Sequence, residues 1–522
     1  MVIKSNSQQI EQSNGWIKPQ NETAASVSTM SPCALHALWA ILVSAAFLTG
    51  CQSTAALQQA ATAHFDSGHP QQAIKALTDA NNKRQSETEI LQADLAIAEL
   101  MAGNAKQTER QLKQVQEELD YLLQKDLKEQ ALAVLSDSRS IAYSGRDFEN
   151  GMIRNLLTLS SMVSDRHDAF AFASQAMEVV TADLQQQSLV HQTVDQLAEP
   201  LPNSGPSISP TVTVSHQANT SPRGNLEPRK SAHSLSAYLH ALVHSESALD
   251  RKLTQNSVQQ IDYWSTELNK PPSPAFGTLT AKQHGSLHVI TLTDRVTDWI
   301  PENALPTSAS LLLADQILSA TGKYSLPPTV APVKIAKPAR QKCVNPFVTS
   351  VQIANHTPML RSQSLIDLNH AAWDSYQADR DKQLATAVAR RIVKKGAIYA
   401  TKDQLSVQGG SEIDAVLNIT GVIWESLEKA DTRHVSLLPG RIEVVNTALP
   451  VGQHSVQLSA VSMQSKSNEA KQAALAAVSV PVTIQDGRNT VILCFRIGNR
   501  YVGNILINDG TVIPLTSSPS LR

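Results

Sequence analysis

A polar segment at residues 186–232 most constrains how this chain of 522 residues can fold. The segment opens in a run of glutamines, has prolines at short intervals and is rich in Ser and Thr, with few large apolar residues. Such a composition cannot bury enough apolar surface to offset the entropy that is lost on ordering. We therefore predict a disordered linker within an α+β multidomain chain, which is helical before the linker and mixed after it.

Residues 51–185 have apolar positions at helical spacing, interrupted by turn residues. Gly68 and Gly103 mark two turns that are 35 residues apart, and Ser164 marks a third, 61 residues further on. Tetratricopeptide (TPR) repeats have a nominal period of about 34 residues, so the second interval requires an inserted helix, which we place at residues 126–138. The pattern predicts TPR-like α-helical hairpins; generic antiparallel helices without a binding groove remain the alternative.

Residues 233–435 read as a mixed helical and β region. Helical spacing returns over residues 235–268. Strand-like runs follow at residues 287–292 and 330–335, and Pro332 restricts the second run to the edge of a sheet.

One or two further helices are predicted over residues 365–395, where the helical pattern ends at Gly396. Positive charge near a helix C-terminus offsets the negative end of the helix dipole, and glycine permits the left-handed stop. Capping is therefore a sufficient explanation for the basic residues of the last turns, and contact with a phosphate or an anionic glycan is the alternative. These residues are Arg390, Arg391, Lys394 and Lys395.

Three histidines lie close to one face of the predicted helix at residues 235–268. His240 and His244 have the i, i+4 spacing of metal ligands, but no Glu follows His240 as a zincin motif requires, and no third ligand is evident. We interpret them, with His233, as a solvated helix face and predict no metal and no cofactor.

Residues 436–515 alternate in the manner of strands. A Pro-Gly turn at residues 450–452 leads into one strand, and runs at residues 478–484 and 489–497 are separated by Asp486-Gly487. These features predict a small β-sandwich, which is similar in its turn-and-strand opening to PEGA-type surface modules.

An uncharged apolar run extends from Ala34 to Leu48. It is shorter than the roughly 20 residues of a membrane-spanning helix and matches the apolar region of a signal peptide, which is about 7 to 15 residues long. Thr49, Gly50 and Cys51 follow it directly. Small residues before a cysteine suit cleavage by a peptidase and acylation of the thiol.

Leu48-Thr49-Gly50-Cys51 resembles the lipobox of bacterial lipoproteins at all four positions. The resemblance implies that residues 1–50 are a lipoprotein signal peptide and that Cys51 is lipidated, which holds the protein at the membrane surface. Gln52 in place of Asp implies transfer to the outer membrane. No Lys or Arg lies between Met30 and Cys51, so we favour a translation start at Met30; a long neutral leader remains the alternative.

Cys343 and Cys494 remain after the signal peptide and the lipidated cysteine. An exported chain is exposed to an oxidising space, so the two thiols could form a disulfide. The alternative is that Cys494, within an apolar strand-like run, serves as a small buried residue.

Two motifs nearly 300 residues apart support a wider resemblance. Residues 143–149 read Tyr-Ser-Gly-Arg-Asp-Phe-Glu before a helix, and residues 430–433 read Ala-Asp-Thr-Arg, followed by a Leu-Pro-Val-Gly-Gln-His run at 449–454. The chain thus resembles a family of uncharacterised bacterial lipoproteins with N-terminal TPR-like helices and a C-terminal β domain. It departs from that pattern at Arg146 and Val435, and at Leu156 with its neighbour Leu157.

The charge balance and the motifs limit the classes of function. With 44 basic and 46 acidic residues the net charge is -2, which argues against a nucleic-acid partner. No nucleophile elbow, P-loop, zincin or dinucleotide motif is present in the sequence. We predict a protein that is not an enzyme: a lipid-anchored scaffold for envelope proteins on the periplasmic face of the bacterial outer membrane. The alternative is a protein that binds or hydrolyses an envelope polymer, either peptidoglycan or polysaccharide.

Overall fold

The computed structural model describes residues 54–82, 88–123, 143–197, 232–264, 276, 281–321, 331–339, 346–354, 356–404, 429–463 and 477–515. Cys51, Cys343 and residues 198–231 of the predicted linker lie outside these ranges. None of the helices within them has the length and apolar character that a membrane crossing requires.

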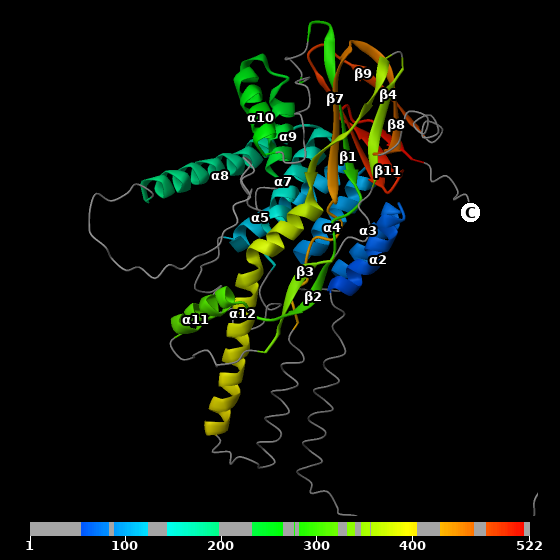
Figure 1. Ribbon diagram of the computed structural model, residues 1–522. Coiled ribbons are helices and arrows are strands. Elements are labelled where there is room, and N and C mark those ends of the chain that lie inside the picture. Colours follow the sequence, from blue (N-terminus) through cyan, green and yellow to red (C-terminus); the bar gives the residue numbers. More distant parts are fainter. Residues whose placement is uncertain are drawn as a thin grey trace, which may run out of the picture. The chain divides into compact units, whose positions relative to one another are not determined.

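The N-terminal region is helical, as its periodicity predicts, and each described helix packs against the next one along the chain (Figure 1). Gly68 and Gly103 lie in turns with φ angles of 78° and 88°, which favour glycine. The predicted helix at residues 126–138 lies outside the described residues. The helices are α2 (Thr54–Asp66), α3 (Pro70–Asn82), α4 (Thr88–Met101), α5 (Ala105–Leu123), α7 (Asp147–Met162) and α8 (Ala169–Leu197).

The predicted start of the linker at residue 186 is wrong, because α8 continues to Leu197. Residues 186–197 are polar, but Gln and Leu have good helix propensity and no proline occurs before Pro200. Polarity alone therefore did not end the helix.

The largest sheet contains, in spatial order, β12 (Val512–Pro514), β11 (Arg500–Ile507), β10 (Asn489–Ile497), β1 (His284–Thr293), β7 (Arg441–Pro450) and β6 (Gln363–Asp367). β1 runs parallel to β10, and the other neighbouring pairs are antiparallel. The run at residues 287–292 is part of β1, as predicted, and β1 is buried on both faces over nearly its whole length.

A second sheet contains β5 (His356–Arg361), β4 (Phe347–Ile353), β8 (Gly452–Ser462) and β9 (Val478–Ile484), all antiparallel. A separate two-stranded sheet pairs β2 (Trp299–Ala304) with β3 (Val333–Pro338). β3 has β2 as its partner in this sheet, which agrees with the edge position that Pro332 predicts.

The sheets join strands from both sides of the boundary that we expected between residues 435 and 436. β1 pairs with β7 and β10, and β4 pairs with β8. The two segments therefore share their sheets and do not form separate β and mixed domains. Periodicity identifies a strand from its own residues but carries no information about a partner that lies far along the chain.

The remaining helices differ from the predictions at their ends. The helical pattern predicted over residues 235–268 is divided by a short turn of 3₁₀-helix. The one or two helices expected over residues 365–395 are a single helix, which begins after β6 and continues beyond Gly396. Glycine inside a helix is tolerated at modest cost, so it did not act as a stop. The elements are α9 (His233–His244), η2 (Ala248–Asp250), α10 (Arg251–Trp264), α11 (Ser308–Thr321) and α12 (Leu368–Gln404).

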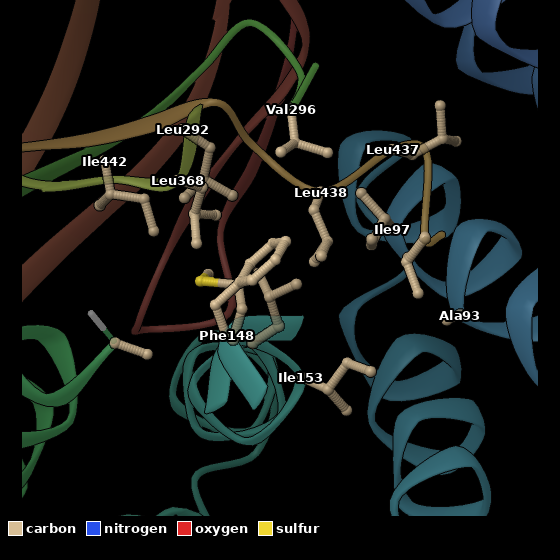
Figure 2. Packing of buried hydrophobic residues seen from close by; sticks show 14 of the residues in the cluster. Ala93, Ile97, Phe148, Ile153, Leu292, Val296, Leu368, Leu437, Leu438 and Ile442 are labelled. Carbon is tan, nitrogen blue, oxygen red and sulfur yellow. The ribbon is translucent and has the colours of Figure 1, made fainter. Parts of the chain in front are cut away.

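One apolar core lies between the helices and the six-stranded sheet. Figure 2 shows Phe148 of α7 close to Leu438, with Leu292 of β1 and Leu368 of α12 nearby. A second core joins residues from the two larger sheets, including Val289 of β1. The six-stranded sheet is therefore covered by helices on one face and by the four-stranded sheet on the other.

A buried group of three charges lies at the face between the two larger sheets. Glu443 is 1% exposed by side chain and pairs with Arg441 at 2.6 Å and with Arg496 at 2.7 Å. Its other oxygen accepts hydrogen bonds from the backbone N–H of Thr349 at 2.9 Å and from the hydroxyl of Ser362 at 2.6 Å. A single carboxylate thus connects β7 and β10 of one sheet to β4 of the other.

Cys494 is a free thiol that is fully buried in β10. Burial raises the pKa of this thiol to about 12. The structure is consistent with a small buried residue at this position, whereas pairing with Cys343 is not described.

Replacing Glu443 with Gln is expected to destabilise the protein by about 3–5 kcal/mol, because two buried guanidinium groups lose their carboxylate. Urea unfolding followed by circular dichroism measures the difference. Asp486→Asn, in an exposed turn, is the matched control and should change stability by less than about 0.5 kcal/mol. Equal unfolding midpoints for the two variants would contradict this role of Glu443.

Candidate functional site

The two motifs that are nearly 300 residues apart in the sequence meet in the structure. The guanidinium of Arg146, in the loop before α7, donates hydrogen bonds to the backbone oxygens of Arg433 at 2.8 Å and Asp431 at 3.4 Å. The loop at residues 143–146 and the segment at residues 429–433 therefore form one wall, which neither motif defines alone.

The fully buried side chain of Glu149 connects the two parts of this wall. It accepts hydrogen bonds from the Tyr143 hydroxyl, from the N–H of Arg146 at 3.0 Å and from the N–H of Val435 at 3.3 Å. Burial, followed by the charge of Glu149, holds the pKa of Tyr143 well above its usual value. Tyr143 is thus a neutral hydrogen-bond donor to the carboxylate of Glu149.

Two arginines are fixed by aromatic rings as well as by hydrogen bonds. The guanidinium carbon of Arg146 lies 3.7 Å from the centre of the Trp299 ring, within the range of a cation–π interaction. The guanidinium of Arg433 lies 5.4 Å from the centre of the Tyr143 ring and donates to both oxygens of Asp431, at 2.8 and 2.7 Å. Arg146 is the residue that connects both motifs to β2.

These residues border a cavity of about 620 Å³, which we call the basic pocket. Part of its wall is the loop before α7. The rest is formed by β2, β3, α12 and the segment at residues 429–433, which precedes β7. Six cationic side chains line it against three carboxylates: Arg146, Lys334, Lys382, Arg390, Lys429 and Arg433 against Asp147, Asp379 and Asp431.

One face of α12 forms a side of the basic pocket. Residues 375, 379, 382, 383, 386, 387 and 390 line it, and the recurrence every three to four residues places them on one face of the helix. Lys382 is exposed, whereas Arg390 is only 6% exposed. A buried guanidinium at the wall of a cavity suits bidentate binding of a phosphate or carboxylate group.

The capping interpretation of the basic residues near Gly396 is therefore wrong for two of them, because α12 does not end there. Arg390 lines the basic pocket, and Arg391 donates hydrogen bonds to the backbone oxygens of Ala331 at 3.2 Å and Pro332 at 2.8 Å. Lys394 and Lys395 lie in a part of α12 whose side chains are not described.

Asp94 of α4 binds the residues that directly follow the segment at residues 429–433. It is fully buried and accepts hydrogen bonds from Gln58 at 2.6 Å, from the Ser436 hydroxyl at 2.8 Å and from the N–H of Leu437 at 2.8 Å. Burial raises the pKa of Asp94 to about 6, although these hydrogen bonds oppose the shift.

The three histidines are not on a solvated helix face, and that interpretation is wrong. His233, His240 and His244 are 4%, 7% and 2% exposed, because α8 and α10 cover α9. The His240 ring stacks on His244 at 4.0 Å between centres, and its Nδ1 lies 2.7 Å from the Ser257 hydroxyl. Burial lowers the pKa of His240 to about 4. Among the described residues no group of three or more metal-ligating side chains is placed to hold a metal ion.

Sequence reasoning singled out part of the basic pocket and missed the rest. The residues at 143–149 and 430–433 were identified through the family resemblance, and Arg390 through its basic cluster. Trp299, Lys334 and Lys382 carry no motif in the sequence, because only the tertiary structure brings β2, β3 and α12 to the two loops.

Comparisons of the chain with protein-family models, with curated proteins and with solved structures found no match. The resemblance to a lipoprotein family therefore stays a prediction from the residues themselves.

Acidification is expected to stabilise the wild-type protein relative to Asp94→Asn. The pKa of Asp94 is higher in the folded protein than in the unfolded chain, so the folded state binds the extra proton between about pH 4 and 6. The stability of the wild type minus that of the variant should fall as the pH rises through this window, by an amount on the order of 3 kcal/mol. Urea unfolding of both proteins at pH 4.5, 5.5 and 7 measures it. A difference that does not change with pH would contradict the raised pKa.

Proposed function

We propose that this chain is a bacterial lipoprotein that is not an enzyme, is anchored through a lipid on Cys51 at the periplasmic face of the outer membrane, and acts as a scaffold for envelope proteins. The lipobox at residues 48–51 and the family motifs support the anchor and the location. TPR-like hairpins in the helical region and a sandwich of the two larger sheets are the finer fold that goes with this proposal.

The observation that carries the proposal is the basic pocket. Its lining offers positive charge and hydrogen-bond donors, which bind an acidic group. Several of these donors are already held by contacts within the protein, so little side-chain entropy is lost when a partner binds. The scaffold would thus receive an acidic group of an envelope partner at a place where five parts of the chain meet.

Exposed apolar side chains on neighbouring elements support a protein as the partner. Ile300 of β2, Leu312 of α11 and Trp373 of α12 are 39%, 69% and 40% exposed. α11 packs along α12, and α12 packs on β3 beside β2. Protein interfaces combine aromatic and aliphatic side chains with arginines, and β2 and α12 each carry an exposed apolar residue as well as residues that line the basic pocket.

Binding of an envelope polymer is the second candidate, and the size of the basic pocket favours it. A volume of about 620 Å³ lies in the range of small-molecule sites, about 300–1,000 Å³, and suits an acidic saccharide or peptide unit. The two candidates differ in whether a protein or a polymer carries the acidic group.

Replacing Cys51 with Ser is expected to release the protein from the membrane, because serine cannot carry the thioether-linked lipid and no described helix crosses a membrane. Fractionation of inner membrane, outer membrane and soluble periplasm, with immunoblotting, measures the distribution. Unchanged outer-membrane fractionation of Cys51→Ser would overturn the anchor.

Removing two pocket charges is expected to reduce crosslinking to envelope partners several-fold in cells. Lys334→Gln with Lys382→Gln lowers the positive charge of the basic pocket by two, while Lys75→Gln with Lys113→Gln makes the same change at exposed positions of α3 and α5. Both double variants should stay in the outer membrane. Capture of the same partners at the same yield by all three proteins would show that the basic pocket takes no part in the scaffold role.

A further inference from the structure

More positive than negative side chains line the basic pocket. The cations exceed the carboxylates by three, although the chain as a whole has a net charge of -2. One of the carboxylates, Asp431, accepts two hydrogen bonds from the guanidinium of Arg433 and is not available to neutralise another cation. Like charges that converge on one cavity repel each other, so an anionic group that binds here gains from the local excess of positive charge.

The cations differ in how they are held. Arg146 and Arg433 are fixed by backbone oxygens, by Asp431 and by aromatic rings. Lys334 and Lys382, by contrast, form no ion pair with any side chain in the described part of the chain. The two arginines are therefore held in place before a ligand binds, whereas the two lysines are free of such contacts with the described residues and can adjust to an anion.

The cations also come from separate elements. Arg390 and Lys382 belong to α12, Lys334 belongs to β3, and Lys429 and Arg433 belong to the segment that leads to β7. A ligand with one charged group would contact only part of this wall. A ligand with two or more charged groups would contact several elements at once.

We infer that the basic pocket binds a ligand with at least two oxyanion groups, phosphate or carboxylate, that are held between α12, β3 and the segment at residues 429–433. This inference rests on the proposed binding role of the same pocket. The volume of about 620 Å³ admits a ligand of the size of a small acidic saccharide or peptide unit. Because the ligand connects elements that are distant in sequence, its binding also stabilises the folded protein.

Binding is measured with the purified full-length lipidated protein in an uncharged detergent, at constant ionic strength because salt screens these charges. Inorganic pyrophosphate is the phosphate probe, citrate is the carboxylate probe, and trehalose is the uncharged control. Isothermal titration calorimetry gives the dissociation constant, and thermal unfolding gives the rise in Tm that accompanies binding to the folded state.

Wild type should bind pyrophosphate, citrate or both saturably, with a rise in Tm, and should not bind trehalose. Lys382→Gln should weaken binding by about fivefold or more and Arg390→Gln by more than tenfold, since charge-assisted hydrogen bonds are lost. Because Arg390 is buried and its variant can fail to fold, the exposed Lys382 carries the comparison. Lys113→Gln, on α5, should bind as the wild type does.

The pattern of probes identifies the source of the charge. Binding of pyrophosphate alone points to a phosphate-bearing ligand, and binding of citrate alone points to a polycarboxylate; either result supports the inference. No saturable binding of either probe, or equal affinities for wild type and Lys382→Gln, overturns it. Such a failure would leave the anchor and the scaffold intact, because Cys51→Ser fractionation and crosslinking in cells do not depend on these probes.

Discussion

The rest of the structure depends on the loop at residues 435–440, which two fully buried carboxylates hold in place. Glu149 of α7 accepts the backbone N–H of Val435, and Asp94 of α4 accepts that of Leu437. A buried carboxylate is costly unless it is hydrogen-bonded, so each site specifies one position for the loop. The loop leads directly into β7, which lies beside β1 in the six-stranded sheet. The helical region and the sheet are therefore aligned by polar contacts within a largely apolar interface.

The apolar core around this loop explains why the polar contacts can be so specific. Leu437 and Leu438 are fully buried against α4 and α7, as Figure 2 shows for Leu438 and Phe148. Apolar packing supplies most of the driving force but tolerates small shifts, whereas hydrogen bonds to a buried carboxylate do not. Glu443 has the same role between the two larger sheets. In both places a single acidic residue fixes the alignment of elements from distant parts of the chain.

Local patterns predicted the local structure well. Helical spacing located the helices at either side of Gly68 and Gly103, and the apolar run at residues 287–292 located β1. The same patterns failed where an outcome depended on partners: α12 continued past Gly396, and His240 was buried by α8 and α10. Helix propensity and periodicity describe a segment by itself, whereas burial is decided by what packs against it.

The sequence by itself located the N-terminal helices and strands such as β1, β9 and β10, and it indicated a lipid-anchor motif ending at Cys51. It also identified the residues at 143–149 and 430–433 as a related pair. Only the tertiary structure decided that these residues share a basic pocket with Trp299, Lys334 and Arg390. The physical reason is that secondary structure follows from interactions a few residues apart, while a cavity and its charge arise from contacts between segments whose separation the sequence does not encode locally.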